Sequence, residues 1–483
     1  MRPIMGDWTG KRSVPEDTSN RSPAREELIL RALTFASLPS PYHVTSLPVI
    51  ASPSLRPHSS SRFTTLNFGG GAPAPAKPSP TLLRLARALE RQFKLAGRVS
   101  GAYVFDITTG RELYALRAGV KRPPASVEKL FTTVALLNDL GPAGRLHTAV
   151  YATGHLGAGG VWHGNLYLRG GGDPTFGDGT FNRIWEQGYG PTASQLALAL
   201  AHYGIQRVTG QLIGDASLFD ALRGPPSSNY QPDIPDLGGQ LSALTFDHGA
   251  TLAAAVTRNT GPVTTPHRTA PPLTPGALAA RELALTLKSL HVAVTASTHT
   301  ATTPARAHRL ATVSSPPISV MLRLMNVPSD DFFAEMLTKQ LGVKVMGSGT
   351  TKSGAYVISS ALRSYHLHPQ IVDGSGLSRR DLASPLEVVD LLRYIDRTVT
   401  GATLAASLPT VGVSGTTRTI AVHTAAAGRC IGKTGTLDNV SNLAGYCHAR
   451  GRQLVAYALF VDGPPNWTAL TLIGRMVAAI ATY

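Results

Sequence analysis

A helical pattern of apolar positions begins just after two consecutive prolines near residue 124. Leu130, Val134 and Leu137 recur at helical spacing, and Gly141-Pro142 ends the run. Proline is tolerated at the start of a helix and poorly inside one, so the pattern predicts that the helix begins close to Ser126. This places a serine at a helix N-terminus, where unpaired backbone N–H groups favour negative charge.

The first 78 residues show no sustained apolar period. They are rich in Ser, Pro, Arg and Thr, and residues 69–78 have the Gly- and Pro-rich composition of a linker. We therefore expect residues 1–78 to be a disordered extension and linker. A helix at 82–95 and a hairpin of strands at 102–107 and 112–116 are predicted to follow it.

Between residues 143 and 309 short apolar segments alternate with turns rich in Gly, Pro and Thr. Strands are predicted at 150–152, 166–168 and 211–213, with a helix at 194–202. The glycine cluster at 170–175 lacks the Gly-Lys-Ser/Thr ending of a phosphate-binding loop, so it is interpreted as a turn. We expect 143–309 to be one or two inserted β-rich domains.

Helical periodicity returns after residue 315 and precedes a strand-rich end of the chain. The pattern predicts two helices, three strands and a last helix, at 332–341, 385–398, 429–436, 442–449, 453–461 and 467–481. Helices on both sides of an antiparallel sheet predict an α+β fold, an α/β/α sandwich. The insert would divide this domain into two parts, 79–142 and 310–483.

The chain has 483 residues, a formal net charge of +16 and 43% hydrophobic residues, which allows a large core. A positive balance favours anionic surroundings such as nucleic acid, acidic polymers or a membrane surface. No long block of Lys and Arg and no nucleic-acid-binding signature is present, so we do not expect nucleic acid as a partner.

Membrane, export and metal signals are also missing from the sequence. No stretch approaches the roughly 20 apolar residues that span a bilayer. The mildly apolar residues 28–50 are interrupted by Arg31 and three prolines, so they do not form the apolar core of a secretory signal. His366 and His368 lack a third ligand nearby in sequence, and no Gly-x-Ser-x-Gly elbow indicates an α/β-hydrolase.

Lys129 follows Ser126 by three residues, so both side chains lie on the same face of the predicted helix. A serine hydroxyl becomes a strong nucleophile when a neighbouring base takes its proton, and a lysine with a lowered pKa can be that base. The alternative is structural, because a serine at a helix start is most often only an N-cap.

Two further motifs lie downstream. Lys433-Thr434-Gly435-Thr436 offers a cation and hydroxyls to a substrate carboxylate, and its glycine lets a substrate backbone approach. Ser329-Asp330-Asp331 precedes a predicted helix, where serine and acidic residues also serve as ordinary caps. The order of the three motifs is that of the active-site elements of penicillin-binding proteins and class A β-lactamases.

The chain resembles one branch of these enzymes, the low-molecular-mass class C penicillin-binding proteins, which are serine-type D-Ala-D-Ala carboxypeptidases and endopeptidases. The resemblance covers about residues 82 to 483. Its most specific segments are Pro124–Lys129, Gly171–Thr175, Gly210–Phe219, Asp373–Ser378, Ser407–Pro409 and Lys433–Tyr446. The family places extra domains between its first and second motifs, which matches the predicted insert and not a compact β-lactamase.

The resemblance implies a set of roles for the motif residues. Ser126 would attack a peptidoglycan stem peptide, Lys129 would be its base, and Ser329 would relay a proton. Lys433, Thr434, Gly435 and Thr436 would bind substrate. Asp331 would also contribute to substrate binding. The expected site therefore comprises Ser126, Lys129, Ser329, Asp331, Lys433, Thr434, Gly435 and Thr436.

The resemblance also implies partners and a location. β-Lactams would trap the same serine, and no metal or organic cofactor is needed. The family acts outside the cytoplasmic membrane, in the periplasm or cell wall, so a start codon assigned too far upstream is our explanation for the missing signal. The oligomeric state does not follow from the sequence.

Asp331 departs from the family pattern, which usually has asparagine there. An ionised aspartate only accepts hydrogen bonds, whereas an asparagine amide both donates and accepts. A carboxylate beside Lys129 also favours the charged lysine, which is the poorer base. The alternative function is therefore a weakly active or inactive relative that binds peptidoglycan or a partner protein.

The two cysteines of the chain lie on two strands that are predicted to be neighbours. One antiparallel register places Cys430 directly opposite Cys447, at a separation that a disulfide can bridge. A bond would suit an oxidising compartment. Two reduced, half-buried thiols are the other possibility that the sequence leaves open.

Overall fold

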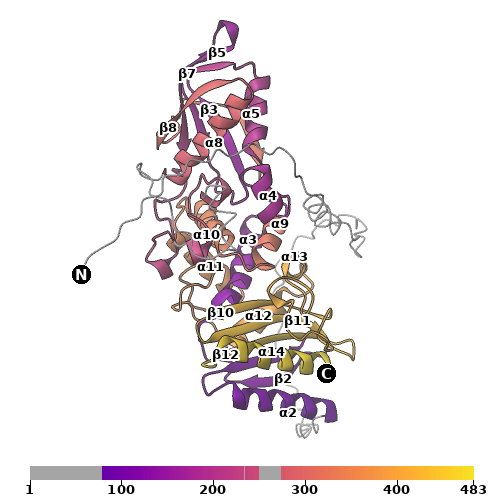
Figure 1. The fold of residues 1–483 in the computed structure, drawn as a ribbon. Coiled ribbons are helices and arrows are strands. Elements are labelled where there is room, and N and C mark those ends of the chain that lie inside the picture. The colour runs from indigo at the N-terminus through magenta and orange to yellow at the C-terminus, as the bar shows by residue number, and fades with distance from the viewer. Residues whose placement is uncertain (1–78, 233, 250–272) are drawn as a thin grey trace, which may run out of the picture. The chain divides into compact units, whose positions relative to one another are not determined.

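Strands from the two ends of the described chain form one antiparallel sheet (Figure 1). The structure, a computed structural model, describes residues 79–232, 234–249 and 273–483, and the expected extension at 1–78 lies outside them. The strand order is β10-β11-β12-β1-β2. The bounds are β1 Gly101–Asp106, β2 Arg111–Leu116, β10 Cys430–Leu437, β11 Val440–His448 and β12 Leu454–Asp462. All five strands lie where the sequence predicts them.

Alternate residues of each strand enter two different cores, because side chains along a strand point to opposite faces. On β12, Ala458 and Phe460 belong to one core, and Tyr457 and Leu459 belong to the other. Helices cover both faces of the sheet. The α/β/α sandwich expected from the sequence is therefore confirmed.

Two helices, one from each end of the described chain, cover the face that includes Tyr457, and they pack against each other. They are α2 Pro80–Leu95 and α14 Asn466–Ala481. On the other face α12, η1 and η6 contact the strands, and the remaining helices of the domain share the core on that side. Their bounds are α3 Lys129–Asp139, α9 Ile318–Asn326, α10 Asp331–Met346, α11 Thr351–Arg363, α12 Pro385–Ile395 and α13 Val399–Ser407, with the 3-10 turns η1 Ala125–Glu128 and η6 Gly415–Thr417.

The chain between α3 and α9 forms a second, mixed sheet of order β4-β5-β7-β6-β3-β9, with β8 paired to β7. Its strands are β3 His147–Ala152, β4 His155–Leu156, β5 Val161–His163, β6 Leu166–Arg169, β7 Arg207–Asp215, β8 Ala293–Thr300 and β9 His308–Ser314. The helical segments are α4 Gly179–Trp185, α5 Ala193–His202, α6 Ile234–Leu237 and α8 Pro275–Ser289, with short turns η2 Ala158–Gly160, η3 Pro226–Ser228 and η4 Asp247–Gly249.

This inserted region contains the strands expected of it and one long helix that the sequence reading missed. Helix α8 buries Leu283 and Leu287 in the same core as Leu196 and Leu200 of α5. The inserted region therefore contains a mixed sheet packed against helices, and it is not mostly β as the sequence analysis expected. Alanine-rich α8 follows a Thr-Pro start, where Thr274 caps the helix by accepting from Ala277 N–H.

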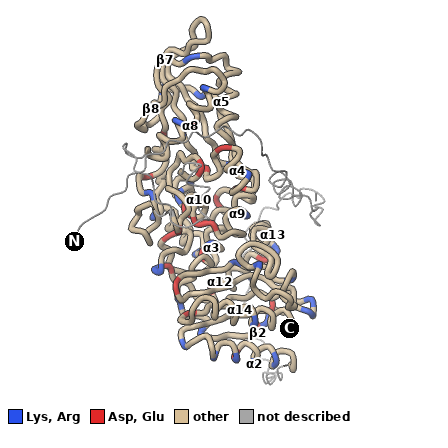
Figure 2. The backbone as a smooth tube through the Cα atoms, in the orientation of Figure 1, with Lys and Arg blue, Asp and Glu red and all other residues tan. Residues whose placement is uncertain are grey.

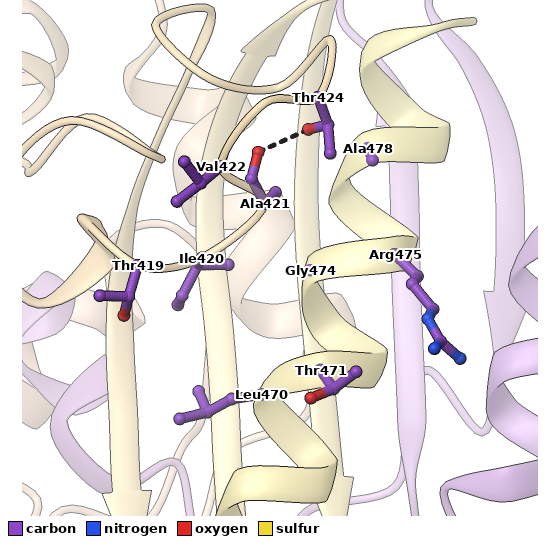
Figure 3. A pocket seen from close by; sticks show the side chains of 10 residues that line it. All are labelled: Thr419, Ile420, Ala421, Val422, Thr424, Leu470, Thr471, Gly474, Arg475 and Ala478. Carbon is purple, nitrogen blue, oxygen red and sulfur yellow. Dashed lines mark hydrogen bonds between the residues drawn. The ribbon is translucent and has the colours of Figure 1, made fainter.

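The outer face of α2 and α14 is basic and partly hollow. Lys and Arg positions recur along α2 (Figure 2). A cavity of about 530 Å³ lies between α14 and the loop of residues 419–424. Figure 3 shows the two walls of this cavity, with Ile420 and Val422 on the loop and Leu470 and Thr471 on α14.

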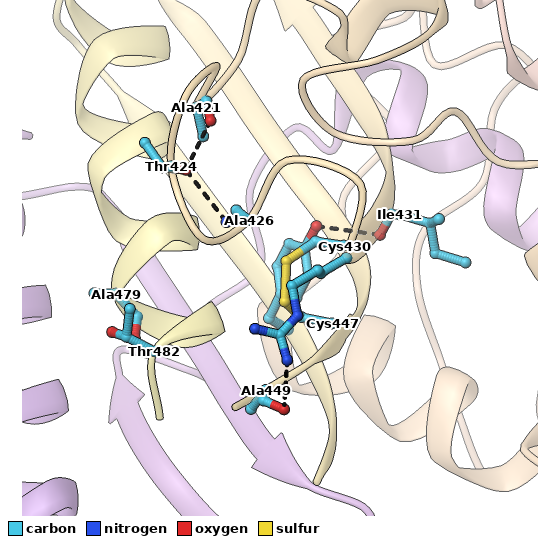
Figure 4. The surroundings of a disulfide bond; sticks show 11 residues. Ala421, Thr424, Ala426, Cys430, Ile431, Cys447, Ala449, Ala479 and Thr482 are labelled. Atoms are coloured by element: carbon cyan, nitrogen blue, oxygen red, sulfur yellow. Dashed lines mark hydrogen bonds between the residues drawn. A yellow bond between two sulfur atoms is a disulfide. The ribbon is translucent and has the colours of Figure 1, made fainter. Parts of the chain in front are cut away.

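Cys430 and Cys447 form a disulfide between neighbouring strands (Figure 4). They are direct partners in the β10–β11 register, as the sequence allowed, and their Cα atoms are 4.0 Å apart. Both residues are fully buried beside α14. Of the two possibilities that the sequence left open, the structure has the disulfide.

We expect the disulfide to contribute to stability because it closes a loop with a sequence separation of 17 residues. Loop-closure entropy predicts that the double variant Cys430→Ala/Cys447→Ala loses about 2–3 kcal/mol in the free energy of unfolding. Urea unfolding of oxidised protein measures this loss. Reductant should lower the midpoint of the natural protein to the same extent and leave the variant unchanged; an unchanged midpoint in the natural protein would contradict the prediction.

Candidate active site

Ser126 lies in the 3-10 turn η1, directly before α3, and not at a simple α-helical N-cap. The preceding Ala125 has a φ of 49°, a left-handed conformation that is uncommon for a residue with a side chain. The turn is held from outside by Asn442, whose amide donates to the carbonyls of Pro123 and Pro124 at 3.1 and 2.9 Å. Strain supported by such contacts is typical of functional sites.

Lys129 is fully buried, and its ammonium nitrogen contacts three oxygens. Nζ lies 2.9 Å from Ser126 Oγ, 2.5 Å from Asp331 Oδ1 and 2.8 Å from the carbonyl oxygen of Ser375. These three partners come from segments far apart in the sequence. The structure thus brings together the first and second motifs that the sequence singled out.

The second motif is a tight turn before α10. Ser329 has a φ of 65°, and Asp330, not Ser329, is the N-cap of α10, because Asp330 Oδ1 accepts from Phe333 N–H at 2.9 Å. The structural alternative for Ser329, an N-cap, is therefore wrong. Its hydroxyl instead accepts a hydrogen bond of 2.7 Å from Lys433 Nζ.

The third motif lies on β10, the edge strand of the sheet next to η1. Lys433 Nζ also donates to the carbonyl of Thr434, at 2.9 Å. The Thr434 hydroxyl donates to Thr416 Oγ1 at 2.7 Å. Gly435 packs so closely on the Ser126 turn that a side chain there would clash with the carbonyl of Pro124.

The hydroxyls of the site and its two lysines differ in exposure. Ser126 and Ser329 are half-buried and Thr436 is exposed, whereas Lys129 and Lys433 are 0% exposed. The three hydroxyl-bearing residues are therefore nearer the surface than the two lysines. This is the arrangement in which a lysine can take a proton from a hydroxyl without meeting bulk water.

Burial and charge act on the pKa values of the site in opposite directions. Burial and the neighbouring Lys129 cation hold the pKa of Lys433 well below its usual value, although Asp331 opposes this. Burial raises the pKa of Asp331, against the effect of the Lys129 and Lys433 cations.

Further acids lie beneath Lys129. Glu335, one turn after Asp331 on α10, accepts from the N–H groups of Gly374 and Ser375 at 3.1 and 2.9 Å. Burial and the nearby Asp373 raise the pKa of Glu335 to about 8. Burial likewise raises the pKa of Glu128 well above its usual value, with Asp373 adding to the effect.

Sequence reasoning missed several residues that position the expected ones. Glu335 carries a weak signal, because it lies four residues after Asp331 on the same helical face. The Ser375 contact uses a backbone carbonyl, which has no side-chain signal. Thr416 lies outside the segments that carry the family resemblance, whereas Asn442 lies inside Lys433–Tyr446 but was given no role. Among the described residues no group of His, Cys, Asp and Glu is arranged to hold a metal ion.

Comparison with known proteins identifies the class that this fold and site define. The sequence profile of the D-Ala-D-Ala carboxypeptidase 3 (S13) family matches residues 83–274 and 272–483. The chain belongs to this family, and it is a serine-type D-Ala-D-Ala carboxypeptidase, a hydrolase of the penicillin-binding protein class.

Individual relatives agree with the family assignment. A D-alanyl-D-alanine carboxypeptidase of Actinomadura sp. is 29% identical over 86% of this chain and 88% of its own length. A carboxypeptidase of Mycobacterium tuberculosis is 28% identical over 78% of each chain. The crystal structure of penicillin-binding protein 4 from Haemophilus influenzae covers 82% of this chain and 99% of its own, with a TM-score of 0.66 and 19% identity, which shows the shared fold.

The raised pKa of Glu335 predicts how stability depends on pH. The folded protein binds this proton more tightly than the unfolded chain does, so stability is highest below the ordinary glutamate range. It falls as the pH rises from about 4.5 to about 8. Glu335→Gln keeps an oxygen acceptor for the two N–H groups and removes this titration.

Urea unfolding at about pH 5 and about pH 8 measures the effect. We expect the loss of stability between the two pH values to be smaller in Glu335→Gln than in the natural protein. The exposed Glu90→Gln is the matched control and should keep the natural difference. An equal loss in Glu335→Gln would show that this carboxyl does not titrate in the folded state.

Proposed function

We propose that the protein removes the terminal D-Ala of peptidoglycan stem peptides through a covalent acyl-enzyme on Ser126, and that β-lactams acylate the same serine. The main observation in support of this proposal is the hydrogen bond of 2.9 Å between Ser126 Oγ and Nζ of the buried Lys129. It supplies the nucleophile and the base within hydrogen-bond reach of each other. One of the structures with this fold is a penicillin-binding protein 4 complexed with a β-lactam, which supports the proposal by analogy.

In the acylation step Ser126 Oγ forms a bond to the carbonyl carbon of the penultimate D-Ala. The hydroxyl proton passes to Lys129 and the carbonyl oxygen becomes an oxyanion. Backbone N–H groups of Ser126 and Thr436 are the proposed donors to that oxyanion, each worth about 10²–10³ in rate. Thr436 suits this role because β10 is an edge strand, with backbone groups that β11 does not use.

Collapse of the intermediate breaks the peptide bond and releases D-Ala. Ser329, whose Oγ accepts from Lys433 Nζ at 2.7 Å, relays the proton taken up by Lys129 to the leaving amine, so that the Ser126 proton leaves with D-Ala. Lys433 and the exposed hydroxyl of Thr436 attract the terminal carboxylate of the substrate, with Thr434 and Gly435 shaping the strand beside it. Water then attacks the ester carbonyl and regenerates the Ser126 hydroxyl.

Asp331 supports a second candidate function, a relative with weak turnover that chiefly binds peptidoglycan or a partner. Its Oδ1 lies 2.5 Å from Lys129 Nζ, and its side chain is 16% exposed. An ionised carboxylate at this distance stabilises the charged lysine and so reduces the fraction of free base. It also cannot donate a hydrogen bond to a substrate carbonyl. Both candidates place the protein outside the cytoplasmic membrane, where peptidoglycan is found.

The nucleophile can be tested by labelling the protein with a fluorescent penicillin and measuring intact mass. We expect one adduct per chain in the natural protein and none in Ser126→Ala, because only the Ser126 hydroxyl lies beside Lys129 in η1. Ser364→Ala, which changes an exposed serine, is the control and should keep the adduct. An adduct that survives in Ser126→Ala would disprove the assignment.

Asp331→Asn tests what the unusual acid does. The change removes a negative charge that favours the charged form of the neighbouring lysine, so we expect acylation at about pH 7 to become about tenfold faster. An adduct found only in Asp331→Asn would favour the weak-turnover candidate, whereas equal rates at every pH would show that Asp331 does not control the base.

A further inference from the structure

The catalytic site leaves the positive charge of the chain unexplained, and part of it is concentrated on α2. Four cations recur at intervals of three or four residues on the side of α2 that faces away from the sheet, namely Arg84, Arg87, Arg91 and Lys94, and a fifth, Arg98, follows the end of the helix. All five are exposed, while Leu85, Leu89 and Phe93 are buried on the opposite side. Figure 2 shows this run of basic positions along α2.

These cations are not neutralised by the protein. Within the part of the chain that the structure describes, none of the five takes part in an ion pair. Glu90 is the single acid on α2, and the neighbouring α14 carries Arg475 and no acid. The exposed side of the two helices is therefore an uncompensated positive surface.

Large apolar side chains are interspersed with the charges. Leu83, Leu95 and Val99 are 40%, 62% and 61% exposed beside the cations of α2. On α14, Trp467 is 75% exposed and lies on the same side as Thr471 and Arg475, at intervals of four residues. The cavity lined by Ile420, Val422 and Leu470 extends this apolar surface along α14 (Figure 3).

We propose that this basic helical face, formed by α2, α14 and the loop of residues 419–424, docks the protein onto an anionic phospholipid bilayer. Lys and Arg attract the headgroups, and tryptophan and aliphatic side chains enter the boundary between headgroups and acyl chains. No helix in the described ranges is long and apolar enough to cross a membrane, so the contact would be peripheral.

Charge argues against two other occupants of the face. Residues 1–78 contain more Lys and Arg than Asp and Glu, so that segment is not a charge complement to α2. A second copy would present the same positive face and repel it. A soluble polyanion would satisfy the cations, but it offers no apolar environment for Leu95 or Trp467.

The position of the face is compatible with catalysis. Helices α2 and α14 pack on one side of the five-stranded sheet, while η1 and α10 belong with the core on the other side. Docking through α2 would therefore leave Ser126 free to meet a substrate. The proposal does not depend on the catalytic assignment, because membrane binding and acylation are measured separately.

Vesicle flotation with the full chain tests the proposal. We expect binding to vesicles of phosphatidylglycerol mixed with phosphatidylcholine, none to pure phosphatidylcholine, and loss of binding at about 1 M salt, where the Debye length falls to about 3 Å. The triple variant Arg84→Gln/Arg87→Gln/Arg91→Gln should bind about 100-fold more weakly. Trp467→Ser should weaken binding and abolish a blue shift of tryptophan emission on docking.

The matched control removes three exposed cations elsewhere, as Arg207→Gln/Lys288→Gln/Lys352→Gln. It lowers the net charge equally and should change affinity by less than about threefold; far-UV circular dichroism of every variant checks that it is folded. If both triple variants bound vesicles equally weakly, net charge alone would explain binding, and the proposal would be overturned. Binding to polyphosphate as tight as to vesicles, unaffected by Trp467→Ser, would assign the face to a soluble polyanion.

Discussion

The candidate active site depends on one buried lysine. Lys129 is 0% exposed, so its ammonium group is shielded from bulk water and must find its partners within the protein. It finds them in Ser126, Asp331 and the carbonyl of Ser375. These partners belong to η1, to the start of α10 and to a distant loop. The hydrogen bonds of Lys129 therefore hold α10 and that loop in place beside Ser126.

The acids beneath Lys129 would overcompensate this cation if all of them were ionised. Burial prevents that by raising the pKa values of Glu128, Glu335 and Asp381, with neighbouring carboxyls adding to each shift. Asp331 is the carboxyl in direct contact with the lysine. Position 331 is therefore the carboxyl that bears most directly on the Ser126–Lys129 pair.

Local patterns predicted the sheet and most of its helices, because apolar periodicity reflects burial on one or two faces. The sequence allowed one register that places the cysteines opposite each other, and the structure has that register. The sequence did not predict features that depend on backbone conformation or on contacts between distant segments. These are the left-handed conformation of Ser329, the contact of Lys129 with the Ser375 carbonyl, and the hydrogen bonds that Glu335 of α10 accepts from the Ser375 loop. Helix α8 was missed although the Thr274-Pro275 start and the spacing of Leu283 and Leu287 both indicate a helix. The three motifs could be recognised in the sequence by their residue types and their order. Glu335 and Thr416, which position the motif residues, lie outside the three motifs.

The five-stranded sheet separates two electrostatic environments. Alternate residues of β12 pack into two different cores, one on the face with the buried lysines and the other on the face covered by α2 and α14. The five-stranded sheet lies between the core under α2 and the core that holds the two buried lysines, so the exposed charges of α2 are separated from them by more than the Debye length of about 8 Å at physiological salt. Exposed charges at such a separation are largely screened. The surface of α2 can therefore carry a dense positive charge without disturbing the contacts that hold Lys129 beside Ser126.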